Sequence, residues 1–209
     1  MKEHRDEYLN VEVDTSDIVN QQQQLTPHEW NEGRFSTLAH IREVSLHKTI
    51  EHNCDFYFVV DCDNFLAPET LQHLVNLQRP IVGPMLKPIP NPREYYSNFF
   101  ANVNKYGYYE NSPNYLDYRF NNKTGCFEVP VVHCTYLIQR EYLPYVMYID
   151  GTKAYEFVIF SKSTRDNNVK QYLCNEIPFG SLCHPPDNVI LEEEQELFEK
   201  YKANNPLIF

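Results

Sequence analysis

Residues 55–64 read DFYFVVDCDN, and this stretch decides the fold. Its five residues from Phe56 to Val60 are all apolar or aromatic. A short apolar run without alternation is typical of a strand that helices cover on both faces. A turn residue, Asn64, and a helix start at Ala67-Pro68-Glu69 follow it. We therefore predict a central β-strand in an α/β domain, with a helix directly after it.

The strand ends in two aspartates, Asp61 and Asp63. Side chains alternate along a strand, so both carboxylates point to the same side, at the end of the strand where α/β sheets bind ligands. Like charges this close repel unless a cation lies between them. Mn²⁺ or Mg²⁺, completed by phosphate oxygens, suits such oxygen ligands. The alternative is a pair of solvated turn aspartates, since Asp-x-Asp is a common tripeptide.

Helical and strand patterns continue on both sides of this strand. An apolar stripe predicts a helix over residues 35–50, and Arg42 lies inside the stripe, so its stem packs or its charge is paired. Downstream we expect a helix over 71–77 and a buried strand over 79–85. This alternation favours a mixed, mostly parallel, Rossmann-type sheet flanked by helices. Residues 8–13 alternate like a further strand.

The composition and the hydrophobic periodicity of the sequence change after residue 85. Residues 86–130 are rich in Pro, Asn and Tyr and show no helical period, which predicts antiparallel ribbons over 95–100 and 106–109. Their tyrosines would form either a wall that stacks on sugar rings or ordinary packing. Beyond them we expect strands over 126–130, 132–138 and 170–174, a helix over 154–160, a Pro-rich loop over 179–188 and a final helix over 190–201.

Composition limits the function classes. The formal net charge is -11 in 209 residues, which argues against nucleic acid and against anionic membrane surfaces as partners. No apolar run is long enough to insert in a membrane. The six cysteines contain no Cys-x-x-Cys pair, so we expect free, buried thiols.

The motifs, taken in order, resemble the N-terminal glycosyltransferase-type domain of the procollagen galactosyltransferases, the family-25 collagen-modifying enzymes. They are similar, more distantly, to the glycosyltransferase region of lysyl hydroxylases. The matching segments are residues 58–64, 81–86, 95–99, 107–109, 125–138 and 172–175. The resemblance implies one GT-A-like domain over 1–209 that lacks the first β-α-β unit of the family.

The resemblance also implies a function. It suggests transfer of galactose or glucose from a UDP-sugar to hydroxylysine of a collagen-like polypeptide, with Mn²⁺ or Mg²⁺ as cofactor. The compartment would be the endoplasmic reticulum lumen or the secretory pathway, and a homodimer or further domains of the same enzyme are possible partners. The alternatives are a non-catalytic GT-A-like accessory module and a metal-dependent phosphotransfer or hydrolase site on Asp61 and Asp63.

Site residues follow from the same resemblance. Asp61 and Asp63 would hold the metal that bridges the donor diphosphate, and Asn98 and His133 would line the donor or acceptor pocket. For His133 the alternative is a satisfied histidine on a core strand. In place of the family's Asp-Asp pair the chain has Lys153-Ala154-Tyr155-Glu156, which leaves Glu156 or Asp150 as the catalytic base. A family histidine is replaced by Asn188, with His184 as a possible substitute metal ligand.

Overall fold

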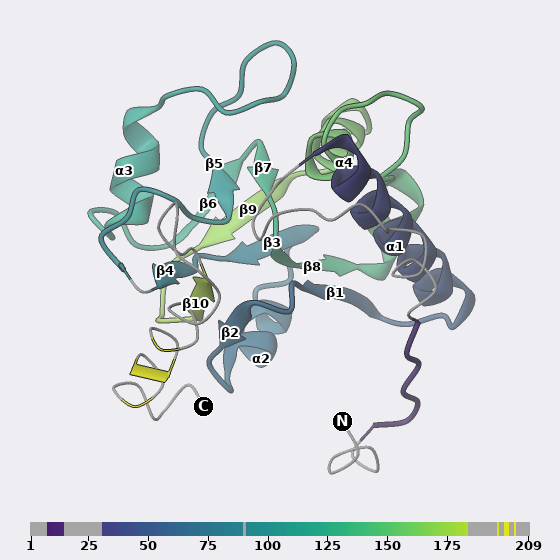
Figure 1. Ribbon diagram of the computed structural model, residues 1–209, viewed down its shortest axis with the longest axis horizontal. Coiled ribbons are helices and arrows are strands. Elements are labelled where there is room, and N and C mark those ends of the chain that lie inside the picture. Colours follow the sequence, from purple (N-terminus) through teal and green to yellow (C-terminus); the bar gives the residue numbers. More distant parts are fainter. Residues whose placement is uncertain are drawn as a thin grey trace.

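A five-stranded sheet forms the centre of the protein (Figure 1). The computed structural model describes residues 8–14, 31–89 and 91–183, together with 196, 199, 200 and 203. In spatial order the strands are β1 (Phe56–Val60), β8 (Thr135–Gln139), β3 (Ile81–Pro84), β9 (Gln171–Cys174) and β6 (Cys126–Val129). The predicted central stretch is thus a strand, β1, and it lies at one edge of this sheet.

The pairing within this sheet is mixed. β8 runs antiparallel to both of its neighbours, β1 and β3, and β6 runs antiparallel to β9. Only β3 and β9 pair in parallel. The predicted mixed sheet flanked by helices is therefore confirmed, but the prediction that most of its pairs are parallel is wrong. The two strands that the first α-helical crossover connects, β1 and β3, are separated by β8, which enters from much later in the chain.

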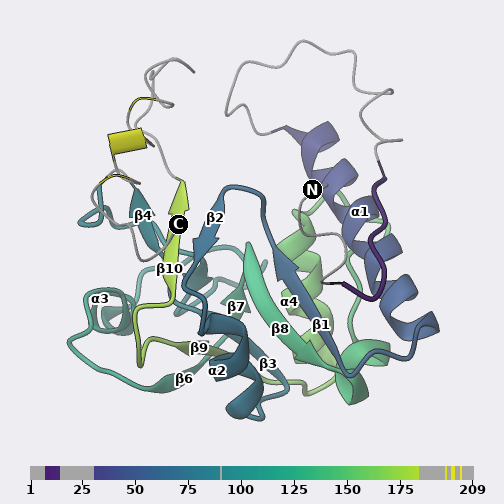
Figure 2. The ribbon, with the colours of Figure 1, turned by 90° about the horizontal axis from the view of Figure 1, so that it is seen from below.

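Helices cover both faces of the sheet, as the apolar run of β1 predicts. On one face, α1 (Glu32–Glu51) and α4 (Glu156–Asp166) lie side by side (Figures 1 and 2). Tyr57 and Val59 of β1 belong to the apolar cluster on that side. The other face packs against α2 (Thr70–Asn76), where Phe56 and Phe58 contact the second cluster. Alternate residues of one strand therefore serve two cores.

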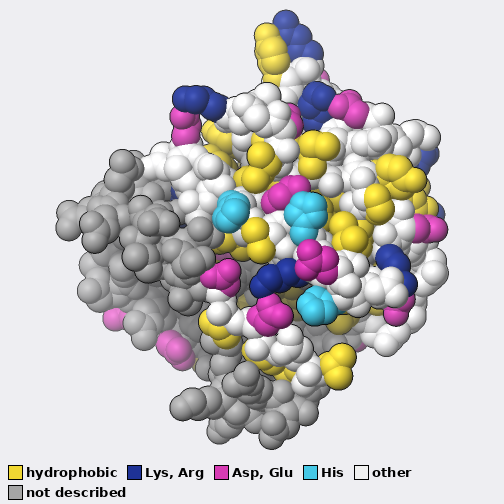
Figure 3. All heavy atoms as spheres, turned by 90° about the vertical axis from the view of Figure 1, so that its right-hand side faces the viewer, with side chains coloured by type: hydrophobic (Ala, Val, Ile, Leu, Met, Phe, Trp, Pro, Cys, Tyr) yellow, Lys and Arg dark blue, Asp and Glu magenta, His cyan; other side chains and the backbone are white. Residues whose placement is uncertain are grey.

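α1 begins where the sequence supplies a cap. The side chain of Asn31 accepts a hydrogen bond from the backbone N–H of Arg34, which satisfies one of the free donors of the first turn. The buried residues of α1 are Phe35, Ala39, Arg42 and Leu46, so a buried stripe with Arg42 inside it is confirmed. Figure 3 shows one face of the molecule, on which acidic, basic and histidine side chains are mixed with hydrophobic ones.

Two smaller sheets flank the larger one. A three-stranded sheet contains, in spatial order, β2 (Asn64–Leu66), β10 (Gly180–Cys183) and β4 (Lys87–Ile89). A two-stranded sheet pairs β5 (Phe99–Phe100) with β7 (Val131–Val132), and an isolated bridge joins Val103 to Tyr109. The remaining elements are α3 (Pro113–Arg119) and the 3₁₀ helix η3 (Arg140–Tyr145). The antiparallel ribbons are thus present but shorter than predicted.

Three local predictions were wrong. Residues 8–14 are not a strand. A short helix, α3, lies within the region predicted to be free of helices, and β10 lies at the start of the predicted Pro-rich loop. Most of the predicted final helix, residues 190–201, falls outside the described residues. In the part of the chain that the structure describes, no helix combines the length and the apolarity that crossing a membrane requires.

Candidate functional site

Asp61 and Asp63 lie on the turn that leads from β1 to β2. The backbone N–H of Asp61 donates to the carbonyl of Cys134 at 3.0 Å, and the carbonyl of Asp63 accepts from the N–H of Cys183 at 3.0 Å. The backbone between the two aspartates is therefore fixed to the start of β8 on one side and to β10 on the other. Asp63 is exposed, and the side chain of Asp61 is 28% exposed. Both carboxylates are accessible to a ligand.

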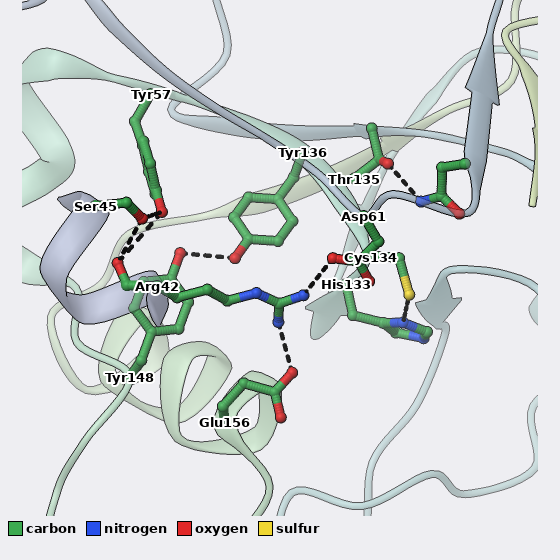
Figure 4. A network of polar contacts seen from close by, with 11 residues as sticks. Arg42, Ser45, Tyr57, Asp61, His133, Cys134, Thr135, Tyr136, Tyr148 and Glu156 are labelled. Carbon is green, nitrogen blue, oxygen red and sulfur yellow. Dashed lines mark hydrogen bonds and ion pairs between the residues drawn. The ribbon is translucent and has the colours of Figure 1, made fainter. Parts of the chain in front are cut away.

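Arg42 of α1 lies between two of the predicted site carboxylates (Figure 4). Its Nη2 is 2.8 Å from Oδ1 of Asp61, and its Nη1 is 2.5 Å from Oε1 of Glu156. The residue is only 5% exposed. Burial lowers the pKa of Arg42, but the acidic groups around it, led by Tyr136 and followed by Asp61 and Glu156, raise it well above its usual value. The guanidinium is therefore a fixed internal positive charge.

Glu156 is the first residue of α4 and is 3% exposed. Its Oε2 has no hydrogen-bond partner among the described residues, while Oε1 binds Arg42. Burial raises the pKa of the carboxyl above its ordinary value, and Arg42 opposes this effect only in part. A buried carboxylate with one free oxygen and a raised pKa has the properties of a general base.

Asp150, the other predicted base, lies elsewhere. It is exposed, in the loop before α4, and its Oδ1 accepts hydrogen bonds from the backbone and the hydroxyl of Thr152. Although burial acts in the opposite direction, the hydrogen bonds from Thr152 hold its pKa below the usual value. Among the described residues, Asp150 makes no hydrogen bond or ion pair with Arg42, Asp61 or Glu156.

His133 and Cys134 form a tight turn next to Asp61. The N–H of Thr135 donates to the carbonyl of His133 at 2.7 Å, and Cys134 has a φ of 64°, a left-handed conformation that costs energy for any residue other than glycine. Nδ1 of His133 lies 2.9 Å from the Cys134 sulfur. Strained backbone of this kind collects at binding and catalytic sites.

The His133 ring itself is buried and uncharged. Burial lowers its pKa to about 3, and the charge of Arg42 acts in the same direction. Its Nε2 has no hydrogen-bond partner among the described residues, although the rings of Phe100 and Phe157 pack at 5.5 and 5.1 Å from it. The structure therefore brings His133 next to Asp61 and leaves its Nε2 buried without a hydrogen-bond partner among the described residues.

Asn98 has a different position. It is fully buried, and its amide accepts from the N–H of Leu86 at 2.9 Å and donates to the carbonyl of Pro84 at 2.8 Å. The backbone carbonyl of Asn98 accepts a hydrogen bond from the backbone N–H of His133 at 3.0 Å. Because its polar groups are engaged within the fold, Asn98 is suited to hold the chain ahead of β8 in place rather than to contact a ligand.

An aromatic pocket adjoins the aspartates. It has a volume of about 700 Å³ and is lined largely by Tyr95, Tyr96, Phe99, Phe100, Tyr109 and Tyr115. Tyr96 connects the two regions: burial raises the pKa of its hydroxyl, and Cys134, Asp63 and Asp61 raise it further. The predicted tyrosine-rich segments thus meet in one hollow beside the carboxylates.

The carboxylates of Asp61 and Asp63 are of the chemical type that binds a divalent cation. Glu156 adds a third carboxylate and Arg42 one guanidinium, but among the described residues the three carboxylates do not form a group whose ligand atoms all lie within 4.8 Å of one another. Carboxylate oxygens are the ligands that Mn²⁺ and Mg²⁺ prefer, and the two aspartates remain accessible. His184 and Asn188, the other predicted ligands, lie outside the described residues.

Sequence reasoning did not assign Arg42 and Cys134 to the site. For Arg42 a signal existed, because a charged residue inside an apolar stripe needs a partner. For Cys134 the sequence offered none, since a left-handed turn at a cysteine has no sequence signature. Tyr96 belongs to the tyrosine-rich stretch that was predicted to stack on sugars or to pack, but its proximity to Asp61 and Asp63 depends on the tertiary fold.

Comparison with known proteins assigns the chain to a family. Residues 1–201 match glycosyltransferase family 25, N-terminal domain. The chain is 32% identical over 184 residues to procollagen galactosyltransferase 2 of Mus musculus and 34% identical over 167 residues to procollagen galactosyltransferase 1-A of Xenopus laevis. These alignments cover 83% and 76% of this chain. The chain therefore belongs to glycosyltransferase family 25.

Two further comparisons qualify this result. The chain spans 29% and 27% of the length of those two relatives. It is also 28% identical, over 85% of its length, to a Mus musculus protein named inactive glycosyltransferase 25 family member 3, of which it spans 30%.

Among solved structures, A197 from STIV superposes with a TM-score of 0.45 at 15% identity, covering 66% of this chain and 64% of that one. This TM-score is too low to support a shared fold.

Proposed function

We propose that this member of glycosyltransferase family 25 is a GT-A-like domain that binds a UDP-sugar with Mn²⁺ or Mg²⁺ and transfers galactose or glucose to hydroxylysine of a collagen-like polypeptide. The observation that carries the proposal is the accessible Asp61–Asp63 pair, fixed at the end of a buried strand, in a chain of this family. The endoplasmic reticulum lumen or the secretory pathway is the compartment that fits such an acceptor.

The donor side of the site is formed by the aspartates. Asp61 and Asp63 would hold the metal, which supplies a Lewis acid that takes up negative charge on the leaving diphosphate. Arg42 keeps the carboxylate of Asp61 in one orientation through its bond at 2.8 Å. The neutral His133 offers Nε2 to a hydroxyl or carbonyl of the ligand. Arg42, Asp61 and His133 are held in place by contacts within the fold before a ligand arrives.

The acceptor side needs a base and a surface for the incoming chain. Transfer to a hydroxyl requires that its proton be taken up as the new bond forms. Oε2 of Glu156 is the oxygen without a partner among the described residues, and its raised pKa suits it to accept that proton. The pocket around Tyr95 and Tyr109 supplies aromatic faces on which a sugar ring can stack.

A second function, a non-catalytic accessory or binding module, is favoured by one observation. The negative charges of Asp61 and Glu156 are already balanced in part by a side chain of the protein itself, because Arg42 binds both carboxylates. In such a module the carboxylates would hold α1 and α4 against β1 rather than bind a cation. The two functions differ in whether the aspartates bind a metal and a nucleotide.

Calorimetric titration of the chain with UDP, in the presence and absence of Mn²⁺, separates these functions. We expect metal-dependent binding that Asp63→Asn abolishes. Asp63 is the preferred position because it is exposed, whereas Asp61 also pairs with Arg42. Asp55→Asn is the matched control, since Asp55 flanks the other end of β1 and is 82% exposed. Equal binding by the wild type and Asp63→Asn would refute the metal assignment, and no binding by the wild type would favour the accessory module.

A further inference from the structure

Two cysteines lie directly opposite each other on neighbouring strands. In the antiparallel pairing of β6 with β9, Cys126 is the partner of Cys174. The next pair along, Gly125 and Asn175, is joined by a backbone hydrogen bond from the N–H of Asn175 to the carbonyl of Gly125 at 3.1 Å. Hydrogen-bonded and non-hydrogen-bonded pairs alternate along an antiparallel ladder, so the cysteines form a non-hydrogen-bonded pair, in which the side chains approach most closely.

Both thiols point to the same side of the sheet. Cys174 is buried in the apolar cluster that contains Leu74 and Leu182, and Cys126 packs against that cluster from a half-buried position. The neighbouring thiol lowers the pKa of Cys126 and raises that of Cys174, as expected for side chains that lie next to each other. The Cα separation expected for such a pair, about 4.5 Å, is within the range that a disulfide bond spans.

The backbone around the pair is held rigidly. The side-chain amide of Asn175 accepts from the N–H of Gly125 at 2.8 Å and donates to the carbonyls of Tyr118 and Lys123 at 2.9 and 2.8 Å. This fixes the register of β6 against β9 at the cysteines. A bond between the sulfurs would therefore require little movement of the backbone.

We propose that Cys126 and Cys174 form a reversible disulfide when the protein meets a small-molecule disulfide oxidant such as oxidised glutathione. Cys126 is the accessible partner, because it is half-buried and β6 is an edge strand of the sheet. The two exposed cysteines, Cys54 and Cys62, lie outside the strands of the described residues, so neither has a cysteine opposite it in a sheet. The cross-link would tie β6 covalently to β9.

The reaction balances in two exchange steps. The Cys126 thiolate attacks one sulfur of the oxidant, forms a mixed disulfide and releases one glutathione thiolate, which takes up a proton. Cys174 then loses its proton and attacks the Cys126 sulfur, which releases the second glutathione. The protein thiols are oxidised by two electrons and the oxidant is reduced by two. The neighbouring Cys174 thiol lowers the pKa of Cys126, which favours Cys126 as the first nucleophile.

The alternative role of the Cys174 sulfur is to bind a metal ion. His73, Cys174 and Glu176 present ligand atoms within 4.8 Å of one another. However, Nε2 of His73 and Oε2 of Glu176 already lie 3.1 Å apart as a pair at the surface, and the Cys174 thiol lies next to that of Cys126. The contacts therefore favour the disulfide, and zinc binding is an outcome that the test must detect.

The experiment treats the purified full chain with oxidised glutathione after complete reduction. Free thiols are then alkylated, and the protein is digested and analysed by mass spectrometry. We expect a peptide pair linked through Cys126 and Cys174, while Cys54 is alkylated. The oxidised chain should melt roughly 4–16 °C higher than the reduced chain. Cys126→Ser should remove both the linked peptides and the rise in melting temperature.

Cys54→Ser is the matched control, because Cys54 is exposed and lies outside both strands. It should keep the cross-link and the melting shift. Alkylation of both Cys126 and Cys174 after full oxidation would overturn the proposal, as would a linkage of either one to a different cysteine. Titration of the reduced chain with zinc alone completes the test: stoichiometric binding that protects Cys174 from alkylation would assign this place to a metal instead.

Discussion

Replacing Arg42 by methionine should destabilise the protein more than the loss of any exposed ion pair. Methionine keeps the length and apolar stem of the side chain but removes the charge. The change leaves Glu156, whose side chain is 4% exposed, without its positive partner, and Asp61, at 28%, with only partial access to water. Removing one member of a buried ion pair costs about 3–5 kcal/mol. Because water reaches Asp61, we expect the lower end of that range, about 3 kcal/mol.

The assay is urea unfolding followed by circular dichroism, together with calorimetric melting. A loss of about 3 kcal/mol should lower the melting temperature by roughly 6–12 °C in a domain of this size. Arg140→Met is the control, since Arg140 also pairs with an aspartate, Asp55, but the two side chains are 43% and 82% exposed. An exposed pair of this kind contributes up to about 1 kcal/mol.

A double-mutant cycle shows whether the effect comes from the buried pair. If Arg42 stabilises the fold through Glu156, then Glu156→Gln should cost less in the Arg42→Met background than in the wild type. The interaction energy should be about 1–3 kcal/mol, the range for contacting groups in one network. The reasoning is refuted if Arg42→Met costs no more than Arg140→Met, or if the two changes at positions 42 and 156 are additive.

Three further outcomes are expected. Burial raises the folded-state pKa of Glu156 above 4.5, so the stability that its protonated form contributes is present below pH 4.5 and is lost as the pH rises through the folded pKa. Urea unfolding should therefore show that Glu156→Gln gains stability relative to the wild type as the pH rises from acid to neutral. His133 has a folded pKa of about 3 against a usual 6.5, so the wild type should lose up to about 5 kcal/mol relative to His133→Phe as the pH falls through this interval. Parallel acid-unfolding curves of the two proteins would contradict this expectation. Gly180→Ala should destabilise the chain by at least about 3 kcal/mol in chemical denaturation, because φ is 139° there and a Cβ would lie 2.0 Å from the carbonyl oxygen of Phe65.

The sequence predicted the elements better than their arrangement. β1 and α1 follow from hydrophobic pattern, since an unbroken apolar run needs cover on both faces and a 3.6-residue stripe needs one buried side. The position of β8 between β1 and β3 has no such signature, because strand pairing across a long stretch of chain depends on tertiary packing. Short elements such as α3 and β10 are marginal by themselves and form only within the folded domain.

The same distinction explains which site residues could be found. The rule that ligands bind at the carboxyl ends of strands selected Asp61 and Asp63 from the sequence, because both directly follow β1. β8 runs antiparallel to β1, with Val60 opposite Thr135, so the residues that meet the aspartates are those before the start of β8. His133 and Cys134 therefore reach the site from the amino end of a strand, whereas the rule for parallel sheets considers only the carboxyl ends. His133 was predicted from family resemblance alone, and the antiparallel insertion of β8 is the physical reason that it belongs beside the aspartates.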